Sequence, residues 1–166
     1  MGIDCGIAIT GWAVIDNSHN KYKQKLKIVD YGIISTKSSL EIPRRLNILY
    51  EEITEVIDNY KPNFTAIESL FYFKNKKTVI NVAQARGVVL LACAQNNIKT
   101  YDYTPLQVKQ ALTGYGKASK EQMKKMIKLV FKLKEIPKQD DAADALAIGF
   151  CHINNLSFKV YYRNKS

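Results

Sequence analysis

The hydrophobic and polar positions in the first part of the chain predict three β-strands. Residues 2–5 form a short stretch, residues 11–16 alternate between apolar and polar, and residues 27–35 are rich in β-branched side chains, with the polar run 17–20 as a turn between the last two. Two short apolar runs further on, 64–68 and 99–103, are each bounded by polar or turn-forming residues. The pattern therefore predicts five strands.

Between and after these runs the apolar positions recur at helical spacing. The predicted helices are 42–60, 78–95, 105–112, 119–133 and 140 to about 154. Ser119 is the predicted N-cap of the fourth. Strands that first follow one another and then alternate with helices are typical of a mixed α/β sheet covered on both faces. At 166 residues the chain is most simply a single domain, 1–166.

One of these helices is unusual, because the segment VVLLACA at 88–94 is apolar all round. Such a helix lies either in the core or against a partner. The sequence leaves both options open, and the helix 78–95 is our candidate for an interface between subunits.

The charge of the chain is strongly segregated. The formal net charge is +10, yet residues 69–138 contain 14 Lys and Arg against three acidic residues, and the remainder is almost neutral. A basic half favours a polyanionic partner, most often a nucleic acid and less often a membrane surface. A basic face without a dedicated ligand is the alternative.

Composition argues for a protein of the cytoplasm. The three cysteines (Cys5, Cys93 and Cys151) are odd in number and far apart, which is typical of a reducing compartment rather than of a disulfide framework. No apolar run approaches the roughly 18 residues of a membrane span, and no secretory signal pattern follows Met1.

Acidic residues are scarce enough that their grouping is informative. Asp140, Asp141 and Asp144 stand at the head of the last predicted helix, where acids also favour the helix dipole by about 0.3–1 kcal/mol each. Asp141 and Asp144 share a helix face, and Asp4 and Glu68 end two predicted strands. Carboxylates gathered in one cleft raise one another's pKa unless a cation compensates them.

A hard divalent ion such as Mg²⁺ suits an all-oxygen ligand set. Zinc does not, because His19 and His152 show no ligand spacing. A carboxylate cluster beside a basic surface suits two-metal phosphodiester hydrolysis.

The basic half also contains a regular lysine stripe. Lys120, Lys124, Lys128 and Lys132 recur every four residues, and only Glu121 stands near enough in the sequence to pair, with Lys125. A stripe without acidic partners suits phosphate contacts. The aromatic run 71–73 directly follows the Glu68 strand, so one of its rings could stack on an unpaired base, although core packing is the default.

With these residues identified, the sequence closely resembles the RuvC family of Holliday-junction resolvases, which have a ribonuclease-H-like fold. The resemblance runs in family order through GIDCGIAITGWAVI (2–15), AIESLFYFKN (66–75), AQARGVVL (83–90), QVKQALTGYGKASKEQM (107–123) and DAADALAIGFCH (141–152). It implies four catalytic, metal-binding carboxylates, which are Asp4, Glu68, Asp141 and Asp144.

The resemblance further implies a homodimer that nicks two strands of like polarity in a four-way DNA junction. It implies two Mg²⁺ ions per subunit, which Mn²⁺ can replace, and cooperation with a branch-migration helicase complex in the nucleoid of the cytoplasm. Lys109, Lys120 and Phe71 match family positions near the DNA. The full set of expected DNA-binding residues is Phe71, Lys74, Lys76, Lys77, Arg86, Lys109, Lys117, Lys120 and Lys124.

Two departures from the family bear on activity. Cys5 stands where proline is common, and Met1 lies only three positions before Asp4, whereas the first strand of the family usually begins several apolar residues earlier. A shortened strand that loosens the site would leave a junction-binding module without catalysis. The segment GIDCGIAITGW also resembles the phosphate loop of actin-like ATPases. That interpretation is disfavoured, because such proteins need two such domains and far more than 166 residues, and the positive charge of residues 69–138 does not suit an ATP pocket.

Overall fold

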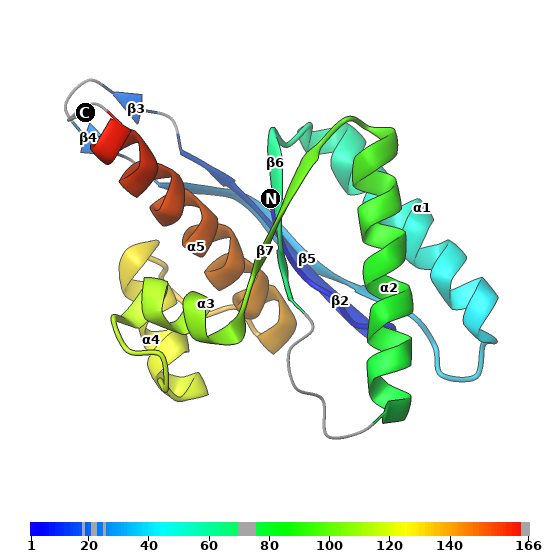
Figure 1. Ribbon diagram of the computed structural model, residues 1–166. Coiled ribbons are helices and arrows are strands. Elements are labelled where there is room, and N and C mark those ends of the chain that lie inside the picture. The colour runs from blue at the N-terminus through cyan, green and yellow to red at the C-terminus, as the bar shows by residue number, and fades with distance from the viewer. Residues whose placement is uncertain (18, 21–22, 25, 70–75, 164–166) are drawn as a thin grey trace.

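Twelve elements of regular structure follow one another in the computed structural model, which describes residues 1–17, 19–20, 23–24, 26–69 and 76–163 (Figure 1). The strands and helices in chain order are β1 Gly2–Asp4, β2 Ile9–Asp16, β3 His19–Asn20, β4 Lys23–Gln24, β5 Lys27–Ser35, α1 Ile42–Tyr60, β6 Phe64–Glu68, α2 Lys76–Gln95, β7 Lys99–Tyr103, α3 Pro105–Thr113, α4 Lys120–Val130 and α5 Asp140–Arg163. The five predicted strands and five predicted helices are all present, and the short β3–β4 hairpin was not predicted.

The main sheet has five strands in the order β5-β2-β1-β6-β7. β1 and β5 each run antiparallel to β2, whereas β6 runs parallel to both β1 and β7. The predicted mixed sheet is therefore confirmed. The two strands at the centre of the sheet, β1 and β6, are parallel and end side by side.

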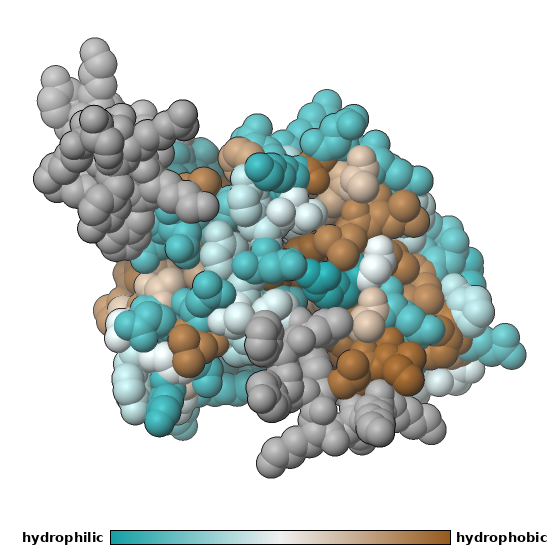
Figure 2. All heavy atoms as spheres, viewed as in Figure 1, coloured by the Kyte–Doolittle hydropathy of each residue, from teal (hydrophilic) through white to brown (hydrophobic). Residues whose placement is uncertain are grey.

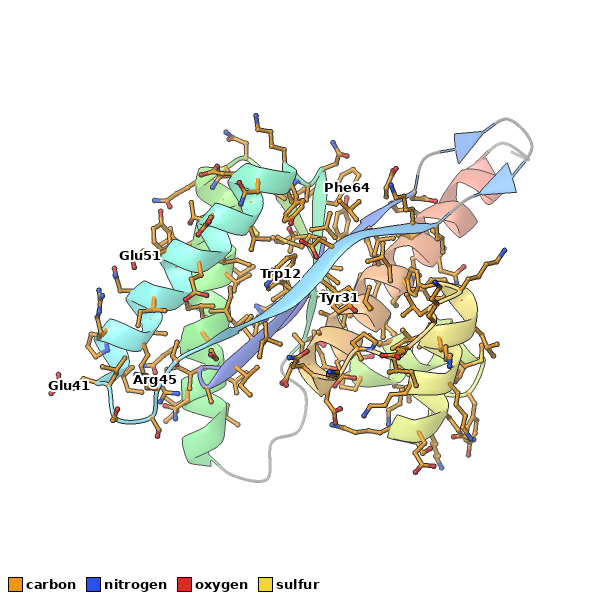
Figure 3. The ribbon with its side chains drawn as sticks, turned by 180° about the vertical axis from the view of Figure 1, so that it is seen from behind. Trp12, Tyr31, Glu41, Arg45, Glu51 and Phe64 are labelled. Atoms are coloured by element: carbon orange, nitrogen blue, oxygen red, sulfur yellow. The ribbon has the colours of Figure 1, made fainter. Side chains whose placement is uncertain are left out.

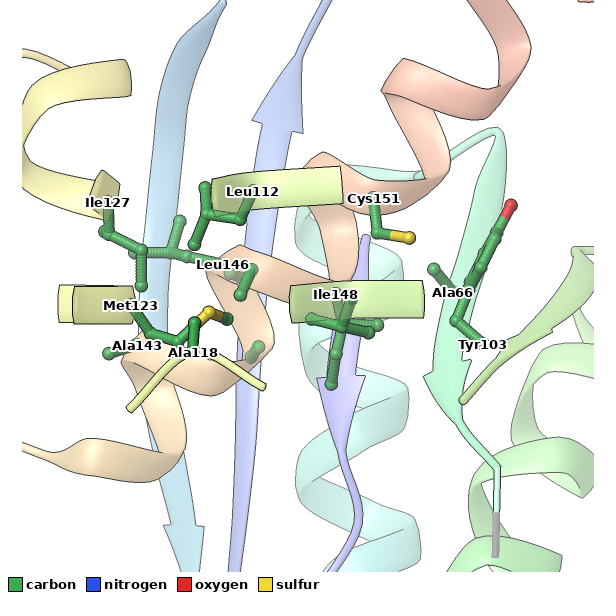
Figure 4. Close-up of a cluster of buried hydrophobic side chains, with 14 residues drawn as sticks. Ala66, Tyr103, Leu112, Ala118, Met123, Ile127, Ala143, Leu146, Ile148 and Cys151 are labelled. Carbon is green, nitrogen blue, oxygen red and sulfur yellow. The ribbon is translucent and has the colours of Figure 1, made fainter. Parts of the chain in front are cut away.

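Helices cover both faces of this sheet and enclose two separate cores. α1 and α2 pack on one face around Ile3, Ile67 and Val89. Figure 3 views the molecule from behind, with α1 in front of α2. α3, α4 and α5 pack on the other face around Leu112, Ile127 and other buried residues, which include Leu146 and Ile148 (Figure 4). Because side chains alternate along a strand, successive residues of β1 and β6 face different cores.

Helix ends explain where the predicted boundaries hold and where they shift. Ser119 caps α4 as predicted, in a capping box with Gln122. α4 ends at Val130, three residues early, in a Schellman arrangement. The N–H of Leu133 donates to the carbonyl of Lys128 at 3.0 Å, and Lys132 takes the left-handed conformation with φ 53°. No glycine marks this end of the helix, so the sequence did not indicate it.

The last helix differs most from the prediction, because α5 continues to Arg163 rather than ending near Asn154. No glycine or proline interrupts the sequence after Gly149. Among the described ranges no helix is long and apolar enough to cross a membrane.

Candidate active site

Two of the predicted carboxylates end the central strands β1 and β6. These strands are parallel and in register, with Ile3 opposite Ile67, so the next residues of the two strands are Asp4 and Glu68. Ile3 and Ile67 are buried in the core beneath α1 and α2. Strand alternation therefore directs Asp4 and Glu68 to the opposite face, the one covered by α5.

Helix α5 approaches that face closely because glycines replace side chains at the contacts. A Cβ on Gly2 would lie 2.2 Å from the carbonyl oxygen of Ala145, and one on Gly11 would lie 2.0 Å from that of Asp141. Gly11 is the pairing partner of Asp4 across the β1–β2 ladder. The backbone of Asp141 is thereby held beside Asp4, and Asp144 follows on the same face of α5.

The charges of these carboxylates influence one another. Burial raises the pKa of Asp4 from 3.8 to about 7, and the charges of Glu68, Asp144 and Asp141 add to the rise. The pKa of Glu68 is also raised, by burial and then by Asp144. Burial raises the pKa of Asp144 as well, with Asp140 and Asp141 contributing. The negative charges at this end of the sheet therefore act on one another.

The donor set fits a hard divalent cation, although the side chains are not arranged around a single point. Among the residues that the structure describes, no three Asp, Glu, His or Cys side chains are close enough together to hold one metal ion. All four groups at this end are carboxylates, which is the ligand chemistry of Mg²⁺. Asp4 and Glu68 end neighbouring strands and the backbone of Asp141 lies against Gly11, so these side chains would have to rotate toward one another to hold an ion.

Two lysines complete the site from the side of α3 and α4. Burial raises the pKa of Glu68, Asp4 and Asp144; the charge of Lys109 partly offsets the rise for Glu68, and that of Lys120 partly offsets it for Asp4 and Asp144. These are the two lysines for which the family resemblance implies a position near the DNA. The site thus combines carboxylates with ammonium groups that could contact a phosphate.

The lysine stripe of α4 is not without acidic partners, so that part of the sequence interpretation was wrong. Asp140 lies on the neighbouring helix α5, with its Oδ1 2.6 Å from the Nζ of Lys124 and its Oδ2 3.7 Å from the Nζ of Lys120. Only tertiary packing brings α5 beside α4, and the sequence by itself indicates pairs only within one helix.

Arg86, expected to flank the cleft, also has a partner that was not foreseen. Its Nη2 lies 2.5 Å from Oδ1 of Asp102 on β7, and the Arg86 side chain is largely buried. Lys117 is exposed in the loop before α4. Phe71 and Lys74 lie outside the described residues, and for Lys76 and Lys77 only the backbone at the start of α2 is described.

The departures at the start of the chain have structural answers. Met1 extends the ladder beyond β1, because its amino group donates to the carbonyl of Phe64 at 2.7 Å and its carbonyl accepts from Ala66 at 2.8 Å. Cys5 is buried, and burial raises the pKa of its thiol far above the usual range. It is therefore a small core residue and not a reactive thiol.

A central pair of parallel strands that end in acids, joined by acids on a helix packed across them, defines a nuclease of the ribonuclease-H-like class. The comparisons agree. The family model for "Crossover junction endodeoxyribonuclease RuvC" matches residues 1–152. The protein of that name from Fusobacterium nucleatum is 56% identical over 162 residues, which cover 98% of this chain and 83% of that one.

Solved structures agree with the sequence relatives. The RuvC structure from Thermus thermophilus has a TM-score of 0.86 at 30% identity and covers 95% of both chains. The structure of Thermus thermophilus RuvC in complex with a Holliday junction substrate has a TM-score of 0.88 at 30% identity and covers 95% of this chain and 94% of that one. The chain belongs to the RuvC family of crossover junction endodeoxyribonucleases.

Proposed function

We propose that this protein, acting as a single nuclease domain, resolves four-way DNA junctions in recombination and repair by Mg²⁺-dependent nicking of two strands of like polarity. The observation that supports this most is that Asp4 and Glu68 end adjacent strands, with the backbone of Asp141 held against Gly11, the pairing partner of Asp4. Burial and the neighbouring carboxylates raise the pKa of Asp4 to about 7. Such an acid is unfavourable in an empty cleft and is stabilised by a divalent cation.

Each group at the site has a role in this proposal. Asp4, Glu68, Asp141 and Asp144 would hold the metal, two ions per subunit, which supplies an activated water and charge compensation for the leaving oxygen. Lys109 and Lys120 bind oxygens of the scissile phosphate and orient it. The surrounding lysines contact the DNA backbone; these are Lys117, which is exposed, Lys124, which is partly exposed, and the predicted residues at the start of α2.

The homodimer is part of the proposal, with α2 as its interface. Ile80 and Leu91 on α2 are 58% and 52% exposed, and the apolar surface over this helix is visible in Figure 2. Between them, Gly87 is exposed, and a Cβ placed there would meet nothing within 4 Å. A glycine costs about 0.5–1 kcal/mol inside a helix. Since no contact among the described residues requires a glycine at this position, we infer that Gly87 permits close approach of a second copy.

A branch-migration helicase complex as a further partner, and the nucleoid of the cytoplasm as the location, follow from the family resemblance. They are part of the same proposal.

The test is cleavage of a synthetic four-way junction labelled on each strand in turn, with and without Mg²⁺. We expect symmetric nicks that require the ion. Asp4→Asn, Glu68→Gln and Asp144→Asn should abolish nicking and retain junction binding in a mobility-shift assay. Asp58→Asn, which removes an exposed acid on α1, is the matched control and should cleave normally.

A junction-binding module without catalysis is the second candidate, motivated by the carboxylates that do not converge on one point. It predicts a shifted band and no nicks by the unaltered protein at any Mg²⁺ concentration. Cleavage that persists in all three carboxylate variants would refute the assignment of the site.

A further inference from the structure

Asp140 occupies a position that neither the proposed metal set nor the helix dipole accounts for. It is the first residue of α5, directly before Asp141, but its carboxylate is directed at α4. One of its oxygens lies 2.6 Å from the Nζ of Lys124 and the other 3.7 Å from the Nζ of Lys120. A residue that only favours the helix dipole needs no such contacts.

The two lysines it contacts are the ones nearest the site on α4. Lys120 is the first residue of that helix, and its charge acts on Asp4 and Asp144. Lys124 lies one turn further on the same face, so the two side chains reach Asp140 from adjacent turns. Lys120 thus pairs with Asp140, and its charge also acts on Asp4 and Asp144 of the carboxylate site.

Without Asp140, little would restrain these long side chains. Lys120 is 74% exposed, and a lysine side chain has about 2 kcal/mol of rotamer entropy to lose on being fixed. α4 is attached to the core through Met123 and Ile127, which are buried. Asp140 is the carboxylate that pairs with both lysines in the described part of the chain.

We propose that Asp140 is a positioning residue, which holds Lys120 and Lys124 beside the carboxylate site so that Lys120 meets the scissile phosphate in place. The inference rests on the proposed function, since it concerns the phosphate on which that site acts. It also carries an opposing effect. Asp140 partly neutralises two lysines and places a negative charge near the DNA, so it weakens binding while it favours turnover.

Asp140→Asn should therefore change binding and turnover in opposite directions. We expect single-turnover cleavage to fall roughly tenfold, because the phosphate-binding group is less well placed. Junction affinity should rise about two- to fivefold, the range of a surface ion pair. The dependence of log Kd on log salt should steepen, because up to two more lysines become free to displace counterions.

Glu121→Gln is the matched control. Glu121 is exposed on the same helix and near Lys124, but in the described part of the chain it makes no ion pair. Its loss should strengthen binding slightly, leave the salt slope unchanged and leave cleavage intact. Asp140→Glu keeps the charge and should restore most of the turnover.

A double variant tests whether Asp140 acts through the lysine. In a Lys120→Gln background, Asp140→Asn should lower cleavage no further, and an additional tenfold loss would overturn the proposal. Parallel loss of affinity and turnover in Asp140→Asn, or behaviour identical to Glu121→Gln, would do the same. If the unaltered protein cleaves nothing, the proposed function fails, whereas the affinity and salt slope still report on the ion pairs of Asp140. Thermal unfolding of each variant identifies any that fail to fold.

Discussion

Replacement of Asp4 by asparagine should stabilise the metal-free protein, and the gain should depend on pH. The native-state pKa of Asp4 is about 7, against 3.8 for an ordinary aspartate. The native state therefore binds more protons than the unfolded state between about pH 4 and pH 7, and its stability falls as the pH rises through that range. Above pH 7 the full cost of the buried charge is present.

The size of the effect follows from the same two pKa values. A rise from 3.8 to about 7 corresponds to roughly 4 kcal/mol, which is an upper limit for the stability gained in Asp4→Asn at pH 8. At pH 5.5 only about half of that cost is present, and near pH 4 almost none. The amide is close in shape to the carboxyl group, so packing contributes little to the difference.

The assay is urea denaturation in the presence of a chelator at pH 4.5, 6 and 8, with Asp58→Asn as the control for a surface acid. We expect the midpoint of Asp4→Asn to exceed that of the unaltered protein increasingly from the lowest pH to the highest, and the control to show no such trend. Excess Mg²⁺ at pH 8 should then stabilise the unaltered protein, by about 2.7 kcal/mol at 100 times Kd, but not the variant. A variant that is less stable at pH 8, or a gain that is equal at all three pH values, would refute the reasoning.

Two further predictions concern how the site is held. Gly11→Ala should destabilise the protein by about 3 kcal/mol or more, because its Cβ would lie 2.0 Å from the carbonyl oxygen of Asp141 and push α5 away from β2. Gly87→Ala, which has open space at its Cβ, should instead stabilise the monomer by roughly 0.5–1 kcal/mol. Urea denaturation measures both effects, and an equal loss of stability in the two variants would contradict this account. Ser119→Ala should cost about 1 kcal/mol because it removes the cap of α4, and an unchanged thermal midpoint would show that the cap contributes nothing.

The sequence predicted the elements well wherever local patterns determine them. The bounds of α1, β6 and β7 follow from apolar periodicity with Pro43, Pro62 and the turn after Gln95, and the structure has them at the predicted residues. The end of α4 was missed because its left-handed residue is Lys132 rather than glycine. The extension of α5 was missed because no residue type marks where it ends.

The sequence could indicate which carboxylates form the candidate site, but it could not indicate which residues of other elements they contact. Asp4 and Glu68 could be paired because each ends an apolar strand, and parallel strands end at one edge of a sheet. Gly11 gave a usable signal, a glycine within an alternating strand, which often marks close approach of another backbone. The partners of Asp140 and Arg86 gave none, because each pair joins elements that only the tertiary fold brings together.

The most direct test of the central claim is the position of the ion itself. Crystals of the protein soaked in Mn²⁺ should show anomalous density at the ends of β1 and β6, with oxygens of Asp4, Glu68, Asp141 and Asp144 at about 2–2.5 Å. That result would show the four carboxylates rotated onto a shared site. Density elsewhere, or a fully occupied ion that none of the four contacts, would contradict the account.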